Sequence, residues 1–167
     1  NQGCADLFSS SGEYSMFDTG FLLSHVAAAI TWVGGMFFAH QVLRPAAISL
    51  AATERLALWV RVFERFFPWV WASIIALVLS GYAMVSGRLG GFAQVGLYVW
   101  IMQGLAFAMI AIFFWIYFHS FRTLRGANNT GQIDMGLAQL AVIRRLVGIN
   151  IVLGFAAAMV GAAGRLL

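Results

Sequence analysis

Residues 95–118 read VGLYVWIMQGLAFAMIAIFFWIYF and contain no charged side chain. About 20 apolar residues in a helix cross the hydrocarbon core of a bilayer, so this stretch alone predicts a transmembrane helix. The whole chain is 62% hydrophobic and 10% charged, with a mean hydropathy of +0.87. We therefore expect residues 20–167 to form an all-α, four-transmembrane-helix up-down bundle. The expected spans are Gly20–Leu43, Phe66–Ser86, Val95–Phe118 and Arg145–Ala163.

The basic residues predict how the bundle is oriented. All ten are arginine, and eight of them flank the first or the third connection between spans. Because basic residues concentrate on the cytoplasmic side, we expect a multi-pass protein of a bacterial-type inner membrane with both termini outside. The bilayer, and not nucleic acid, is then the partner of the positive charge. The eight are Arg44, Arg55, Arg61, Arg65, Arg122, Arg125, Arg144 and Arg145; Arg88 and Arg165 lie on the other side.

Residues 1–19 form a polar segment, which we expect to be an external tail. It lacks the basic start and apolar centre of a secretory signal peptide, and a leader or upstream segment removed before Asn1 is an open alternative. Cys4 is the single cysteine of the chain. It has no internal disulfide partner, and no haem-attachment motif of the Cys-x-x-Cys-His type is present.

The first connection and the span ends carry signals of their own. Arg44-Pro45 predicts the end of the first helix, because proline cannot continue the helical hydrogen-bond pattern. Residues 46–65 have an amphipathic pattern, which predicts a helix that lies in the membrane interface and runs into span two. Aromatic side chains near the span ends, Trp59 among them, predict belts at both interfaces.

Two histidines near the arginine-rich end predict a haem site. His40 and His119 lie near the ends of spans one and three, which run in the same direction and are diagonal neighbours in an up-down bundle. One imidazole from each would ligate the iron of a b-type haem on the bundle axis. Arg44 and Arg122 are close enough along the chain to pair with the haem propionates, although fixing the topology is their simpler role.

The third histidine predicts a second haem site. His25 precedes His40 by about 22 Å of helix. A similar distance before His119 lies Met102, a candidate second ligand, so the chain is expected to hold one haem or two. All three histidines are candidate metal ligands. Each also has an interpretation without a cofactor, as an interfacial side chain or, for His25, as the hydrogen-bond partner of Ser24 or a helix carbonyl.

The first span contains the pattern His25-x6-Trp32-x-Gly34-Gly35, followed by Arg44-Pro45. It resembles the start of the family of small helical membrane proteins that includes copper-resistance protein D (CopD) and the HemJ-type protoporphyrinogen oxidase. The resemblance extends over residues 20–165, through an arginine- and phenylalanine-rich entry into span two and a Ser-Gly-Tyr exit from it.

What the resemblance implies depends on the branch of the family. In HemJ-type members it links the first-span histidine, here His25, to haem, together with a lysine in span three. This chain has no lysine, so protoporphyrinogen oxidation is not expected. In CopD-like members it implies copper handling across the membrane. Copper(I) prefers thioether and thiolate ligands, and Met36 lies one helical turn before His40.

Three functions follow from these observations. The first is a b-type haem electron-transfer protein or cytochrome b-like subunit, with other membrane or redox subunits, or a quinone, as partners. The second is CopD-like copper transport, and the third is a non-catalytic accessory subunit of a larger membrane complex. No hydrolase triad, phosphate loop or zinc signature is present. Any enzymatic activity would therefore be that of a membrane oxidoreductase component whose cofactor carries the chemistry.

Overall fold

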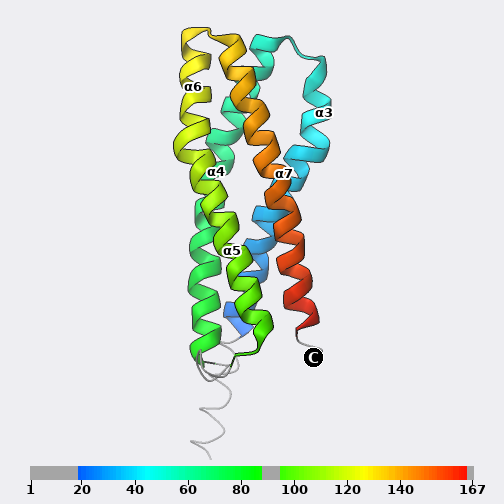
Figure 1. The fold of residues 1–167 in the computed structure, drawn as a ribbon, viewed down its shortest axis with the longest axis vertical. Coiled ribbons are helices and arrows are strands. Elements are labelled where there is room, and N and C mark those ends of the chain that lie inside the picture. The colour runs from blue at the N-terminus through cyan, green and yellow to red at the C-terminus, as the bar shows by residue number, and fades with distance from the viewer. Residues whose placement is uncertain (1–18, 88–94, 165–167) are drawn as a thin grey trace, which may run out of the picture.

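A computed structural model describes residues 19–87 and 95–164, and in these residues it contains four long helices and no strand. Each helix is apolar and long enough to cross a membrane, which confirms the expected all-α membrane fold. Successive helices alternate in direction along an elongated bundle (Figure 1). Cys4, Arg88 and Arg165, on which some of our expectations fall, lie outside the described residues.

The first helix, Thr19–Ser49, combines three kinds of helical turn. Residues 19–29 are α-helical, and two wide π-helical turns then alternate with short α-helical segments before a 3-10 turn ends the helix. Pro45 does not stop the helix where we expected, because it follows a π-helical turn and falls in the first turn of α3, a position that proline tolerates. The segments are η1 (Ile30–Gly34), α2 (Gly35–Phe38), η2 (Ala39–Leu43), α3 (Arg44–Ala46) and η3 (Ala47–Ser49).

The second helix, α4, runs without a break from Ala52 to Gly87 and contains Pro68. Most of residues 46–65 belong to this helix, which confirms a helix that runs into span two. The segment stands upright in the bundle and continues the direction of α4, whereas we expected it to lie flat in the membrane interface (Figure 1). The 36 residues of α4 are about 54 Å long, against about 30 Å of hydrocarbon core. The arginine-rich part of α4 therefore projects beyond the expected span.

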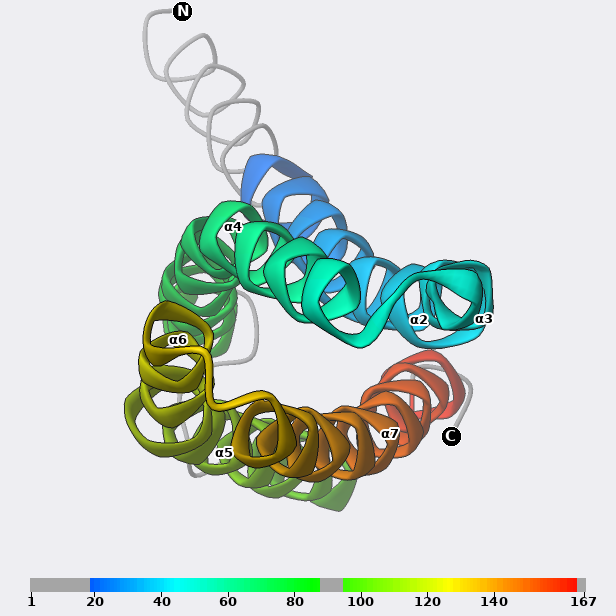
Figure 2. The same ribbon diagram turned by 90° about the horizontal axis from the view of Figure 1, so that it is seen from above.

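The third helix contains one π-helical turn between two α-helical segments, whereas the fourth is α-helical throughout. The third comprises α5 (Leu97–Trp115), the π-helical turn η4 (Ile116–Ser120) and α6 (Phe121–Thr130), and the fourth is α7 (Ile133–Ala163). Seen along the bundle axis, α4 lies between the first helix and the α5–α6 helix, and α7 lies beside α5 (Figure 2). The first helix also contacts α7, so the first and last helices of the chain complete a ring of four.

Aromatic side chains fill the arginine-rich half of the bundle. The rings of Phe63 and Phe67 in α4 stack with their centroids 5.3 Å apart. Phe67 also meets Phe113 of α5 and Phe121 of α6 edge to face. Trp59 is 4% exposed and belongs to this core, so the prediction that it lies in an interfacial belt is wrong.

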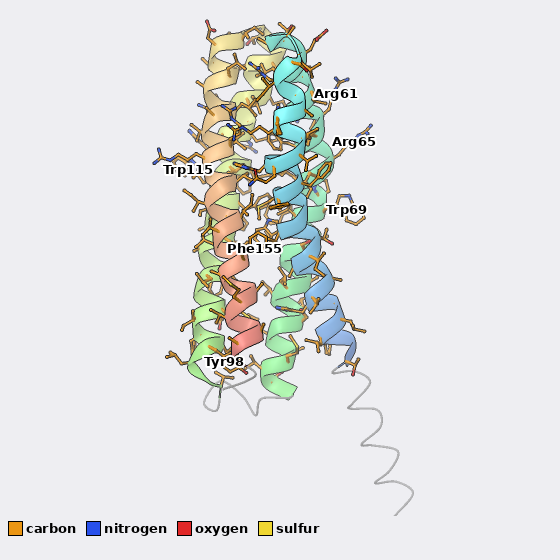
Figure 3. All side chains as sticks on the ribbon, turned by 90° about the vertical axis from the view of Figure 1, so that its right-hand side faces the viewer. Arg61, Arg65, Trp69, Tyr98, Trp115 and Phe155 are labelled. Carbon is orange, nitrogen blue, oxygen red and sulfur yellow. The ribbon has the colours of Figure 1, made fainter. Side chains whose placement is uncertain are left out.

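Other aromatic side chains do point outward at this end. Trp69 of α4 and Trp115 of α5 are 65% and 58% exposed and project from opposite sides of the bundle (Figure 3). Arg65 and Arg61 follow Trp69 toward the arginine-rich end (Figure 3). This order, tryptophan and then arginine, is the one expected where a helix leaves the hydrocarbon core.

Candidate functional site

A pocket in the arginine-rich half of the bundle lies between the first helix, α4, η4 with the end of α5, and α7. It leaves about 40 Å³ of free space, well below the ~300–1,000 Å³ of pockets that enclose a whole organic ligand. We call it the His40 pocket. Its polar lining residues are His40, Arg44, Arg144 and Asn150, and its apolar walls include Trp32, Met36, Phe63, Phe66, Phe67 and Phe113.

His40 projects into this pocket from the π-helical turn η2. Its Nε2 atom faces α7 at Gly148, where a Cβ atom would lie 3.4 Å away. Its Nδ1 atom is buried and has no hydrogen-bond partner among the described residues. Met36, one turn earlier, is 4% exposed and lines the same pocket. An imidazole and a thioether from one helix therefore face the same small space.

Three buried polar atoms around the pocket lack partners. Four such side-chain atoms occur in the described residues, and three of them, His40 Nδ1, Arg44 Nε and Asn150 Oδ1, belong to pocket residues. Asn150 donates through Nδ2 to the carbonyl of Met109 at 3.2 Å, which leaves its Oδ1 as the free acceptor. Each unpaired atom costs about 1–3 kcal/mol. Water or a polar ligand in the pocket would recover this free energy.

The pocket is also positively charged. Arg44 and Arg55 are near enough to Arg144 for their charges to repel its guanidinium group. Among the described residues the one ion pair joins Arg125 to Glu64, with 3.3 Å between Nε and Oε1, and neither residue lines the His40 pocket. His40 and Met36 thus share the pocket with two arginines that form no ion pair with a described carboxylate.

Two more methionine side chains face α7 further along the bundle. Met109 is 4% exposed, and its Cε atom would lie 3.3 Å from a Cβ atom on Gly154. The Sδ atom of Met102 would lie 3.1 Å from a Cβ atom on Gly161. His40, Met109 and Met102 face Gly148, Gly154 and Gly161 of α7 in that order. These glycines are about 9 and 10 Å apart along the helix.

His119 and Arg122 lie away from the pocket. His119 is exposed, and its ring packs on that of Trp115 with the centroids 4.9 Å apart. Arg122 is exposed too, and its guanidinium carbon lies 5.7 Å from the centre of the Phe118 ring. The structure therefore places His40 inside the bundle and His119 on its surface, and the His40 pocket does not bring the two imidazoles together.

His25 lies in a separate polar contact between the first helix and α4. Its Nδ1 atom is 2.9 Å from the hydroxyl oxygen of Ser80 in α4, so its side-chain partner is not Ser24. The ring also hydrogen-bonds the backbone of Leu77 in α4, in agreement with the expected helix carbonyl. The Ser80 hydroxyl donates its proton to the carbonyl of Ala76. With its proton used in this way, the Ser80 oxygen can accept a hydrogen bond from His25 Nδ1. Met102, which packs on α7, is not among these contacts.

The model of the family described as copper resistance protein D, CopD, matches residues 60–163, more than half of the chain. The chain belongs to the CopD family. This confirms the family resemblance, but on α4 to α7, whereas the pattern that suggested it lies in the first helix. No curated protein and no solved structure matches the chain.

The CopD match includes two pocket residues that sequence reasoning missed. Arg144 was assigned to topology alone, and Asn150 was not singled out. Asn150 is a fully buried amide in the apolar part of α7, and a polar residue inside a membrane helix is by default a candidate for function. In the described part of this CopD-family chain, no group of three or more histidine, cysteine or carboxylate side chains is placed to hold a metal.

Proposed function

We propose that this protein binds copper(I) within the membrane and moves it across, with Met36 and His40 as the ligand pair on the arginine-rich side. The observation that carries this proposal is a thioether and an imidazole, one helical turn apart, facing one pocket of a CopD-family bundle. Copper is the cargo here and not a resident cofactor. The proposal concerns the first helix, which lies before the matched residues.

The chemistry of the two side chains supports copper(I) over harder ions. Thioether sulfur and imidazole nitrogen are ligands that copper(I) accepts, whereas magnesium and calcium require oxygen. His40 Nδ1 has no described hydrogen bond to lose when the ring turns toward a metal. A bare cation is costly in a membrane interior. Met109 and Met102 would provide the next soft ligands along α7, at intervals that require side-chain movement between them.

The test is copper(I) binding by the purified protein under reducing conditions, in competition with a chromophoric chelator. Met36→Leu keeps the side-chain volume but removes the sulfur, and we expect it and His40→Ala each to weaken binding about tenfold or more, which corresponds to about 1.4 kcal/mol. Met159→Leu is the matched control, because Met159 is 66% exposed. If Met159→Leu and Met36→Leu weaken binding equally, the pocket is not the site.

Transport requires a second measurement. Proteoliposomes that contain the wild-type protein should accumulate copper(I) faster than empty liposomes, and Met109→Leu should slow accumulation more than it weakens binding. Met109 is buried against Gly154, so leucine fits its volume and leaves the fold intact. Equal accumulation with and without protein would contradict transport while leaving copper binding as measured.

Haem at His40 is the second candidate, favoured by one observation: Arg44 and Arg144 share the pocket with the imidazole. Haem would supply one-electron redox chemistry there; His40 would hold its iron, and Arg44 and Arg144 would pair with its propionates. The aromatic walls would have to part, because the pocket leaves about 40 Å³. A Soret band lost in His40→Ala and kept in His119→Ala would favour haem, and protein that binds copper without a Soret band would exclude it.

A further inference from the structure

The arginines around the His40 pocket need an anion that the described residues do not provide. Arg44 and Arg55 repel Arg144, and the described ion pair, Arg125 with Glu64, involves none of the three. Arg44 and Arg144 line the same pocket, and like charges that share a partly buried site raise the free energy of the fold unless a negative group lies among them. The arrangement therefore favours binding of an anion.

The unpaired polar atoms indicate how that anion would be held. Arg44 Nε is a donor, and His40 Nδ1 donates in one of its neutral tautomers and in the protonated ring. A phosphate or carboxylate offers acceptor oxygens to both, and hydrogen bonds between charged partners are the strong ones. About 40 Å³ accommodates a few oxygen atoms and not an acyl chain. Only the head of an anionic molecule would enter.

The position of the pocket identifies the molecule. Arg44 directly follows the expected first span and Arg144 directly precedes the expected fourth, so both lie where the membrane interface is expected. Deeper in the expected spans, Phe37 and Phe155 of the two facing helices are 42% and 48% exposed. Their rings pack edge to face with centroids 6.1 Å apart, and Phe155 is seen beside the first helix (Figure 3). Charge lies at the head-group level and apolar surface lies below it.

We propose that the His40 pocket binds the anionic head group of a phospholipid. Its phosphate lies between Arg44 and Arg144 with His40 as a further donor, and its acyl chains lie outside the pocket against Phe37 and Phe155. The lipid site shares His40 with the proposed copper site, but Arg44 and Arg144, which would hold the phosphate, are not proposed copper ligands, so the two proposals can fail separately. Phosphate chemistry is shared by a lipid head and by free phosphate, and the apolar surface below the pocket favours the lipid.

The experiment is the thermal unfolding of the purified full chain in detergent, with phosphatidylglycerol, phosphatidylcholine or inorganic phosphate added in separate titrations. We expect phosphatidylglycerol to raise the unfolding midpoint of the wild type at the lowest concentration. In Arg44→Gln/Arg144→Gln its apparent affinity should fall about tenfold or more. The matched control is Arg61→Gln/Arg65→Gln, whose arginines point away from the bundle (Figure 3) and should not affect the titration.

A variant with lysine at both pocket positions separates charge from folding, because it keeps the positive charge and should retain most of the phosphatidylglycerol response. Three results would overturn the proposal: equal responses to the two lipids, equal losses in the pocket and control double variants, or a response to inorganic phosphate as strong as that to phosphatidylglycerol. If the glutamine variant does not fold, the response of the wild type to the three additives still tests whether the protein prefers an anionic phospholipid.

Discussion

Gly34 and Gly35 are neighbours in the first helix, but only Gly35 lies against another helix. A Cβ atom on Gly35 would overlap the ring of Phe66 in α4, coming within 2.6 Å of its Cζ atom, whereas a Cβ atom on Gly34 would meet nothing within 4 Å. Gly35→Ala should therefore destabilise the protein relative to Gly34→Ala. Phe66 lines the His40 pocket, so the displaced ring should also disturb that pocket.

The size of the effect follows from two terms. Alanine in place of glycine favours the helix by about 1 kcal/mol, and this gain is common to both variants, so it cancels in their comparison. Forcing an extra carbon into a packed contact costs about 1–3 kcal/mol. Because Phe66 is half-buried and its ring has some room to turn, we expect Gly35→Ala to be about 1–2 kcal/mol less stable than Gly34→Ala.

The assay is reversible unfolding in mixed micelles with increasing denaturing detergent, followed by tryptophan fluorescence. Copper(I) affinity, measured on the same samples, reports on the pocket. If the two alanine variants differ by less than about 0.5 kcal/mol, a difference typical of surface substitutions, Gly35 and Phe66 do not pack as described and the first helix sits differently on α4.

Three further predictions concern other contacts. Gly136→Ala should cost up to about 2 kcal/mol in the same unfolding assay, because the overlap of its Cβ atom with Cδ2 of Leu56, 2.5 Å away and 0% exposed, costs about 1–3 kcal/mol and the helix preference of alanine returns about 1 kcal/mol; a variant about 1 kcal/mol more stable than the wild type would contradict this packing. Ser80→Ala should cost about 1–3 kcal/mol, because His25 Nδ1 loses its partner; a change near zero would mean that water replaces the hydroxyl. Arg125→Ala should cost under about 1 kcal/mol at low salt and less at high salt, since its ion pair with α4 is exposed.

The four helices were predictable, but their ends were not. Apolar runs of about 20 residues identify spans, because the bilayer demands them. The helices of this chain continue past those runs into arginine-bearing segments, where packing and not lipid decides. Trp59 shows the difference. Its residue type and its place near a span end predicted an interfacial position, whereas it lies in the part of α4 beyond the expected span and packs in an aromatic core.

The sequence predicted how far along the bundle each histidine lies, but not the side of its helix on which the ring emerges. Counting residues places His40 and His119 near the same end, because the rise per residue is constant. The side on which each ring emerges depends on the turns before it, and both histidines lie in π-helical turns, η2 and η4, which the sequence pattern did not reveal. A π-helical turn contains an extra residue, so side chains after it rotate away from the α-helical pattern.

The length of α4 has a consequence for how the protein can be studied. About 54 Å of helix in about 30 Å of hydrocarbon leaves several helical turns standing in water at the arginine-rich end. The tip between α6 and α7 is formed by Gly131, which is exposed and has a φ of 70°. A protease site or short epitope inserted there should be cleaved or labelled in sealed vesicles from one side only. Because Gly131 does not line the His40 pocket, orientation and copper binding could be measured on the same tagged protein.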